Sequence, residues 1–85
     1  MSLAVSKVAV GTTDTTIYTA GADTQIVFGL VSGSMAVINV VRSGSVTSQF
    51  TVSKSGPITG ATGILNGDVI HAVAPYGAEL AVFTF

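Results

Sequence analysis

Short runs of Val, Ile, Thr and Phe, separated by clusters of Gly, Ser, Asn and Asp, constrain the fold of this chain most strongly. No segment places apolar residues at helical spacing. Strand-like runs bounded by turn residues at short intervals are typical of all-β sandwiches and barrels. The sequence therefore predicts one all-β domain over residues 1–85: a small antiparallel β-sandwich, or a jelly-roll or immunoglobulin-like barrel, of about seven strands. The expected strands are Leu3–Val10, Thr15–Thr19, Gln25–Ser32, Met35–Val41, Val46–Val52, Val69–Ala74 and Glu79–Phe85.

The longest predicted break is KSGPITGATGILNGD, residues 54–68, which we expect to be a loop crossing one end of the sandwich. Its glycines loosely resemble a phosphate-binding loop, but the lysine and the strand-to-helix context of such a loop are missing. Within LNGD, Asn66-Gly67 favours a positive φ, and Asp68 can accept hydrogen bonds from nearby backbone amides. We therefore expect a tight turn that leads into the next strand.

Two kinds of side-chain pattern occur in the predicted strands. Residues 46–53 alternate between a mostly apolar and a wholly polar face, as in a sheet that is packed on one side. Residues 26–31, 35–41 and 80–85 are instead apolar on both faces. Because a sandwich this small covers each strand on one face only, this pattern predicts that another chain covers the second face.

Low charge is the strongest sign of assembly. Hydrophobic residues make up 48% of the 85 residues and charged residues 8%, with three Lys or Arg and four Asp or Glu. Surfaces of soluble monomers carry roughly 25–35% charged residues. Three cations provide no footprint for nucleic acid, and the chain has no basic amphipathic helix for a membrane surface. We therefore expect a homo-oligomer or a subunit of a larger assembly, with no nucleic-acid or membrane partner.

Two segments have some features of targeting or membrane signals. MSLAVSKVAV has no basic start, and Lys7 interrupts its apolar run, so we expect no secretory leader. The uncharged stretch Thr24–Val41 nearly reaches transmembrane length, but it contains Gln25, an SGS tripeptide and Asn39. Two strands around a turn explain this stretch better than a membrane helix. The absence of Cys excludes disulfides and thiolate metal sites.

His71 is the only histidine and the main candidate for chemistry. As a general base or metal ligand it would need partners, and no second His, no Cys and no carboxylate at close strand spacing is available. A threefold axis could gather three copies into a metal site, and a pH-sensitive contact is a further alternative. The favoured interpretation is a partly buried or interface histidine with one hydrogen-bond partner. We therefore expect no catalytic residues, no cofactor and no metal.

The remaining polar and aromatic residues fit structural roles. Asp14, Asp23 and Asp68 lie at predicted turns, where such residues commonly sit. Tyr18 and Tyr76 could stack on sugar rings, but buried or interfacial anchoring is the commoner role of tyrosine.

The segments TTIYTAGADTQIVFGLVSGS and LNGDVIHAVAPYGAELAVFTF resemble small virion proteins of tailed bacteriophages. In that pattern, a Thr-Thr-x-Tyr-Thr strand precedes a Val/Ile-rich strand. Gly-Asp, a strand, a small-residue turn and a last apolar strand follow near the end. The match covers about Thr15–Ser34 and Leu65–Phe85, roughly half of the chain, as a pattern and not as identity. The chain departs from longer relatives in lacking a polar insertion between the two blocks and a fibre repeat.

The resemblance implies a structural role on a virion, without catalytic residues. The first hypothesis is a capsid decoration or cement subunit that binds the major capsid protein or other virion proteins, with trimers on local threefold axes. The alternative is a tail, baseplate or fibre-associated module that binds host-surface glycan or another tail protein. The interface candidates are Leu80, Val82, Phe83, Phe85, Tyr18, Tyr76 and His71.

Overall fold

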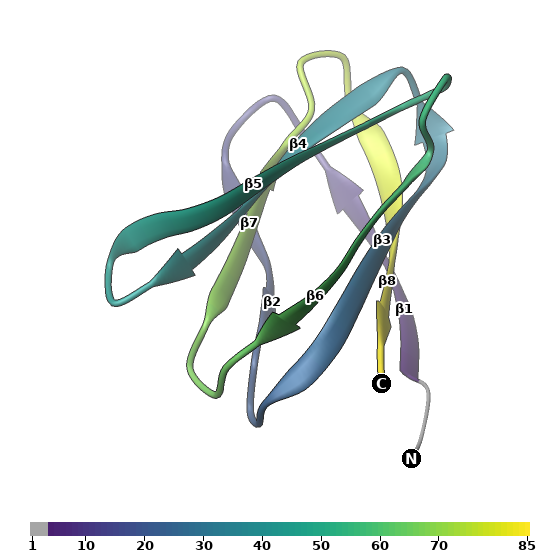
Figure 1. Ribbon diagram of the computed structural model, residues 1–85. Coiled ribbons are helices and arrows are strands. Elements are labelled where there is room, and N and C mark those ends of the chain that lie inside the picture. Colours follow the sequence, from purple (N-terminus) through teal and green to yellow (C-terminus); the bar gives the residue numbers. More distant parts are fainter. Residues whose placement is uncertain (1–3) are drawn as a thin grey trace.

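The computed structural model describes residues 4–85, without the side chains of residues 61 and 62, and this part of the chain is built of strands and turns with no helix (Figure 1). The strands are β1 (Ala4–Val10), β2 (Thr15–Thr19), β3 (Thr24–Gly33), β4 (Met35–Arg42), β5 (Ser45–Ser53), β6 (Ile58–Ile64), β7 (Val69–Val73) and β8 (Ala78–Thr84). No helix of membrane-spanning length and hydropathy occurs in these residues.

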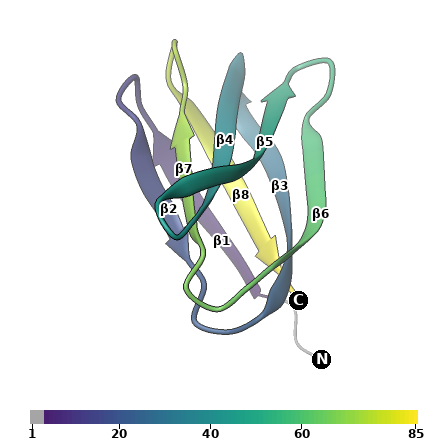
Figure 2. The ribbon, with the colours of Figure 1, turned by 60° about the vertical axis from the view of Figure 1, so that its left-hand side comes forward.

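The strands form two four-stranded antiparallel sheets that pack as a sandwich, seen as two layers in Figures 1 and 2. Sheet A has the order β1-β8-β3-β6, and sheet B has the order β2-β7-β4-β5. The predicted all-β sandwich is confirmed. Of the alternatives, the strand order is that of a jelly roll: β1 pairs with β8, β2 with β7, β3 with β6 and β4 with β5, like one long hairpin folded across itself.

The prediction of a loop over residues 54–68 is wrong, because this segment contains β6 and raises the strand count from seven to eight. β6 is an edge strand that pairs only with β3. Its glycines weaken the sequence signal for a strand, since glycine is depleted in strand interiors. Gly60 has a φ of 112° beside a register shift at Ile26 and Val27, so the glycine marks a β-bulge and not a loop.

The other predicted strands lie within one residue of the observed ends; Leu3 falls outside the described residues. The predicted turns also form. Ser43 and Gly44 both have positive φ in the β4–β5 hairpin, as a two-residue turn of the favoured type requires. Gly67 has a φ of 93° in the turn before β7, so LNGD forms the expected tight turn.

The inward faces of both sheets form one hydrophobic core. Its largest side chains are Phe28, Ile26, Ile38, Ile64, Ile70, Leu80 and Val52. The rings of Phe28 in sheet A and Phe50 in sheet B are 6.2 Å apart and tilted by 40°, so they join the two layers. The predicted apolar face of β5 holds at Phe50 and Val52, but Val46 is exposed because a register shift at Val40 and Val41 interrupts the alternation.

Gly33 is required where β3 ends against β8. Its φ is 99°, and an added β-carbon would lie 2.6 Å from the carbonyl oxygen of Gly77. Gly44 also has a positive φ, of 80°, but an added β-carbon there meets nothing within 4 Å. An alanine at Gly44 would therefore meet backbone strain alone, whereas an alanine at Gly33 would meet backbone strain and a steric clash.

We expect Gly33→Ala to lower the free energy of unfolding by about 3 kcal/mol or more, because both the φ and the clash oppose the side chain. Gly44→Ala should cost only about 1 kcal/mol, from the φ alone. Urea denaturation of both variants and the parent protein measures these differences. Equal losses of unfolding free energy in the two variants would show that β3 and β8 can move apart at Gly33 without a cost in stability.

Candidate functional site

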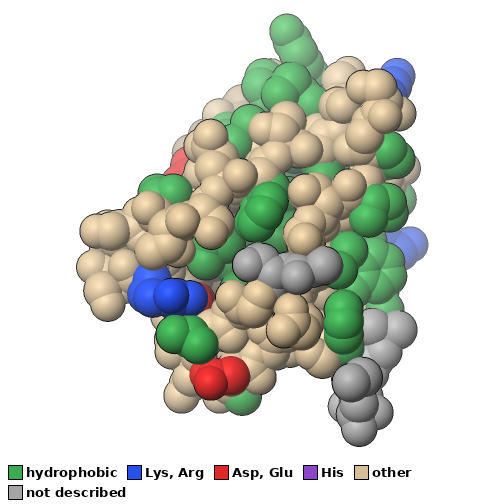
Figure 3. All heavy atoms as spheres, viewed as in Figure 1, with side chains coloured by type: hydrophobic (Ala, Val, Ile, Leu, Met, Phe, Trp, Pro, Cys, Tyr) green, Lys and Arg blue, Asp and Glu red, His purple; other side chains and the backbone are tan. Residues whose placement is uncertain are grey.

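The outer face of sheet A has an apolar part over which no other strand of the described residues packs. Strand register places its side chains in rows, with Val5 and Val27 flanking Phe83, and Ile58 beside Gly29 and Ala81. We call these six residues the apolar outer face. Figure 3 shows hydrophobic side chains along the margin of the molecule on the side of β3 and β8.

Gly29 brings two of these side chains together. A β-carbon at Gly29 would lie 3.6 Å from both Ile58 Cδ1 and Phe83 Cε2, so the two side chains flank the bare backbone of the glycine. Ile58 is 66% exposed even so. The charged residues of this face, Lys7 and Glu79, belong to the outer β1 and to the start of β8, and Lys7 pairs with Ala81. The charges therefore adjoin the face at Ala81, and its apolar part is formed by Val27, Ile58 and Phe83.

β8 divides the predicted interface residues into two groups. Leu80 and Val82 point into the core and are buried within the single chain, so their assignment to an interface is wrong. The alternation of the strand leaves Phe83 half-buried on the outer face, and Phe85 follows the strand and is exposed. Of the four, Phe83 and Phe85 remain available to a partner.

Sheet B presents a polar row on its outer face. Register places Thr16, His71, Asn39 and Gln49 side by side across all four strands. The Gln49 side-chain amide donates to Asn39 Oδ1 at 2.8 Å. This row satisfies part of its own hydrogen-bonding capacity and can be hydrated, which distinguishes it from the apolar outer face of sheet A.

His71 lies between a carboxylate and a hydroxyl. Its Nδ1 is 3.1 Å from Asp14 Oδ2, and its Nε2 is 3.5 Å from Thr16 Oγ1. Sequence spacing could not predict Asp14 as a neighbour, because it lies 57 residues away. The order of groups matches a carboxylate–histidine–nucleophile relay, but such a relay depends on a site from which water is excluded. Here the side chains of His71 and Asp14 are 31% and 56% exposed, so a hydrated structural contact fits better.

A cleft opens at the end of the sandwich where the chain crosses from β2 to β3. Its volume is about 340 Å³. Its lining consists of Ala4, Tyr18, Ala22, Asp23, Thr24, Thr84 and Phe85. We call it the β2–β3 cleft. The Tyr18 side chain also packs against the core, and the Phe85 backbone pairs with Gln25 through hydrogen bonds of 3.0 and 3.1 Å, which fixes where the main chain of Phe85 lies.

The two tyrosines do not share a site. Tyr76 is exposed in the turn between β7 and β8. Figure 1 shows this turn at the opposite end of β8 from residue 85, which lines the β2–β3 cleft together with Tyr18. A single binding site that uses both tyrosines is therefore ruled out by the fold.

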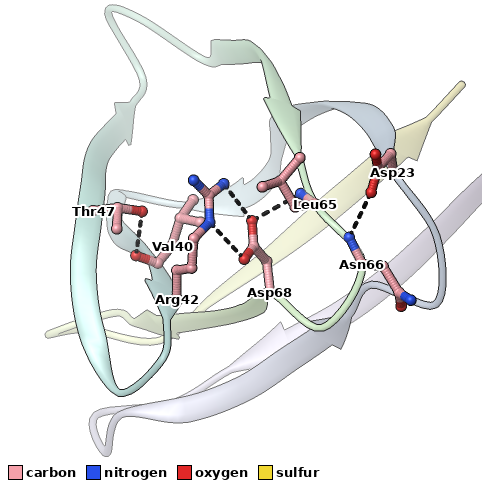
Figure 4. A network of polar contacts seen from close by, with 7 residues as sticks. All are labelled: Asp23, Val40, Arg42, Thr47, Leu65, Asn66 and Asp68. Carbon is pink, nitrogen blue, oxygen red and sulfur yellow. Dashed lines mark hydrogen bonds and ion pairs between the residues drawn. The ribbon is translucent and has the colours of Figure 1, made fainter.

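An ion pair fixes the turn beside the cleft (Figure 4). Arg42 donates from Nε and Nη2 to the two carboxylate oxygens of Asp68 at 2.9 and 2.7 Å, and the Leu65 amide donates to Asp68 Oδ2 at 2.9 Å. Asp68 is the buried charged residue among the described residues, and it stays ionised because it is paired and hydrogen-bonded. One residue along, the Asn66 amide donates to Asp23 Oδ1 at 2.9 Å. The ion pair thus fixes the turn at residues 65–68, and this turn positions Asp23 through the Asn66 amide.

The described side chains contain no group of three His, Asp or Glu residues arranged to hold a metal ion. No known protein family, curated protein or solved structure matches the chain.

The Asp68 contacts make stability depend on pH. Hydrogen bonds from the Arg42 side chain and the Leu65 amide lower the pKa of Asp68 from its usual 3.8 to about 2. A carboxyl group whose pKa is lower in the folded state stabilises the fold above its unfolded pKa, and this contribution is lost as pH falls through the folded value. The Asp68 contribution should therefore be complete above about pH 4 and disappear towards about pH 2.

We expect the urea concentration at the unfolding midpoint of the parent protein to decrease as the pH is lowered from about 4 to about 2. Asp68→Asn should lower the midpoint at neutral pH, because Arg42 loses its charged partner, and should flatten the acid dependence. Asp14→Asn, which changes an exposed carboxylate, is the matched control and should keep the acid dependence of the parent. An unchanged acid slope in Asp68→Asn would contradict the assignment.

Proposed function

We propose that this protein is a structural subunit of a tailed-bacteriophage virion, a capsid decoration subunit that binds the head shell through the apolar outer face of sheet A. Its partners are the major capsid protein or other virion proteins. The single observation that carries the proposal is the apolar cluster on that face, in which the half-buried Phe83 and Val27 and the exposed Ile58 surround Gly29.

The contrast between the two sheets supports attachment by one face. The outer face of sheet B carries the polar row around His71 between two valine pairs, Val37 with Val73 and Val41 with Val69, whereas the cluster around Gly29 on sheet A consists of aliphatic and aromatic side chains. Contiguous exposed apolar patches on small proteins commonly mark interaction sites. An interface of standard size removes about 1,600 Å² from water in total, and half of that is a substantial part of the 4538 Å² surface of this chain.

Low charge and repetition support a shell as the partner. With a net charge of −1, the chain gains little from long-range electrostatic steering, so short-range burial must provide most of the affinity. A shell presents the same site many times, and subunits that associate with one another bind such an array with added avidity. The jelly roll is used by viral capsid domains among others, an analogy of fold that agrees with this role without assigning it.

The first test is the copy number in purified particles. Quantitative mass spectrometry of virions from a tailed phage whose genome encodes this chain should find on the order of hundreds of copies per particle, as repeated binding to a shell requires. A few to tens of copies would instead place it in the tail, baseplate or fibre and overturn decoration. Absence from the particles would overturn the virion role.

The second test addresses the face. Ile58→Ser should weaken co-sedimentation with particles that lack the protein by about tenfold or more, because the most exposed apolar side chain of the face is lost. Val46→Ser is the matched control: Val46 is 59% exposed but lies on β5 of sheet B, and this variant should bind as the parent does. Equal binding by the two variants would show that the sheet A face does not carry the attachment.

A further inference from the structure

We propose that the β2–β3 cleft is a binding site for a neutral sugar. This inference concerns another part of the surface from the apolar outer face and does not rest on the proposed function. It starts from the mixed lining of the cleft, which comprises two aromatic residues, two threonines and one aspartate from three distant parts of the sequence. At about 340 Å³ the cleft lies at the lower end of the range of small-molecule sites, which suits one or two sugar rings.

The apolar part of the lining suits the C–H face of a sugar ring. Tyr18 and Phe85 provide two aromatic side chains, and Ala4 and Ala22 add methyl groups. The Tyr18 side chain is held in advance by the core, and backbone pairing with Gln25 fixes the main chain of Phe85. Little conformational freedom is therefore lost when a ligand packs against Tyr18.

The polar part suits sugar hydroxyls. Asp23 uses Oδ1 to accept the Asn66 amide, and no hydrogen bond among the described residues uses its Oδ2. Thr24 Oγ1 donates to the Phe85 carbonyl at 3.0 Å, which leaves its lone pairs to accept. The hydroxyls of Thr84 and Tyr18 have no hydrogen-bond partner within the described residues and can donate or accept. The cleft thus offers both hydrogen-bond donors and acceptors, which suits sugar hydroxyls because each of them can donate and accept.

Charge argues against anionic ligands. No Lys or Arg lines the cleft, so the Asp23 carboxylate would repel a phosphate or a carboxylate ligand. An ammonium group could pair with Asp23 and donate to the Thr84 and Tyr18 hydroxyls, so it is the competing ligand in the test. A neutral polyhydroxylated ring can, in addition, accept hydrogen bonds from these hydroxyls.

The carboxylate is positioned through the turn that the ion pair holds. Asp68, fixed by Arg42, accepts the Leu65 amide, and the next amide, of Asn66, binds Asp23. Backbone hydrogen bonds of 2.8 and 2.9 Å also join Ala20 to Gly67 and Asp68, so the β2–β3 connection and the turn move as one unit. Arg42 and Asp68 are therefore positioning residues for the cleft.

The test is an NMR titration of the ¹⁵N-labelled protein with methyl glycosides of glucose, galactose, mannose and N-acetylglucosamine, with lactose and with cellobiose. At least one sugar should shift the amides of Thr24, Asp23 and Phe85 with a Kd of about 1 mM, as expected for an open site. Thr84→Val and Tyr18→Phe, which keep the packing, should each weaken binding about fivefold. Asp23→Asn should weaken it about tenfold.

The controls separate this site from the rest of the surface. Asp14→Asn removes the same charge at the other end of β2, and Ile58→Ser alters the apolar outer face, so both should bind the sugar as the parent does. The inference is overturned if no sugar of the panel shifts the cleft amides at about 50 mM. It is equally overturned if the shifts lie elsewhere, if the three cleft variants keep the parent Kd, or if methylammonium binds and the sugars do not.

Discussion

The pairing of β8 between β1 and β3 is the constraint on which the rest of the structure depends. This register turns Leu80 and Val82 towards Phe28 and the core, and turns Phe83 and Ala81 outward beside Val27 and Gly29. Because successive side chains of a strand point to opposite faces, a slip of one residue would exchange the two sets. The same pairing therefore defines the core, the apolar outer face and one wall of the β2–β3 cleft.

The second organising contact is the ion pair between Arg42 and Asp68. Its main effect is to fix the positions of backbone segments relative to one another. It brings the end of β4 to the turn before β7, and that turn is joined to the β2–β3 connection by backbone hydrogen bonds and by Asp23. A buried charge costs free energy unless all of its hydrogen bonds are made. This requirement favours a single arrangement of the end of β4, the turn before β7 and the β2–β3 connection. The geometry of the cleft follows from that arrangement.

The three parts of the surface therefore have different chemistry. The sheet A face is apolar and fits proposed attachment to a repeating partner, the sheet B face carries a hydrated polar row, and the cleft at the chain-crossing end combines rings with hydroxyls. A small sandwich can keep these surfaces apart because each sheet has one outer face and each end has its own connections. Attachment and ligand binding, as proposed, would then not compete for the same residues.

Local sequence pattern predicts the strand character, most strand boundaries and the tight turn at Gly67, because alternation of side chains and turn chemistry act over a few neighbouring residues. It does not predict β6, whose glycines lower the local preference for a strand until β3 supplies hydrogen-bond partners. The burial of Leu80 and Val82, the contact between Asp14 and His71, and the cleft that Tyr18, Asp23 and Phe85 line follow from the three-dimensional fold alone. These contacts join residues far apart in the chain, so they depend on strand order and register, which local pattern does not encode.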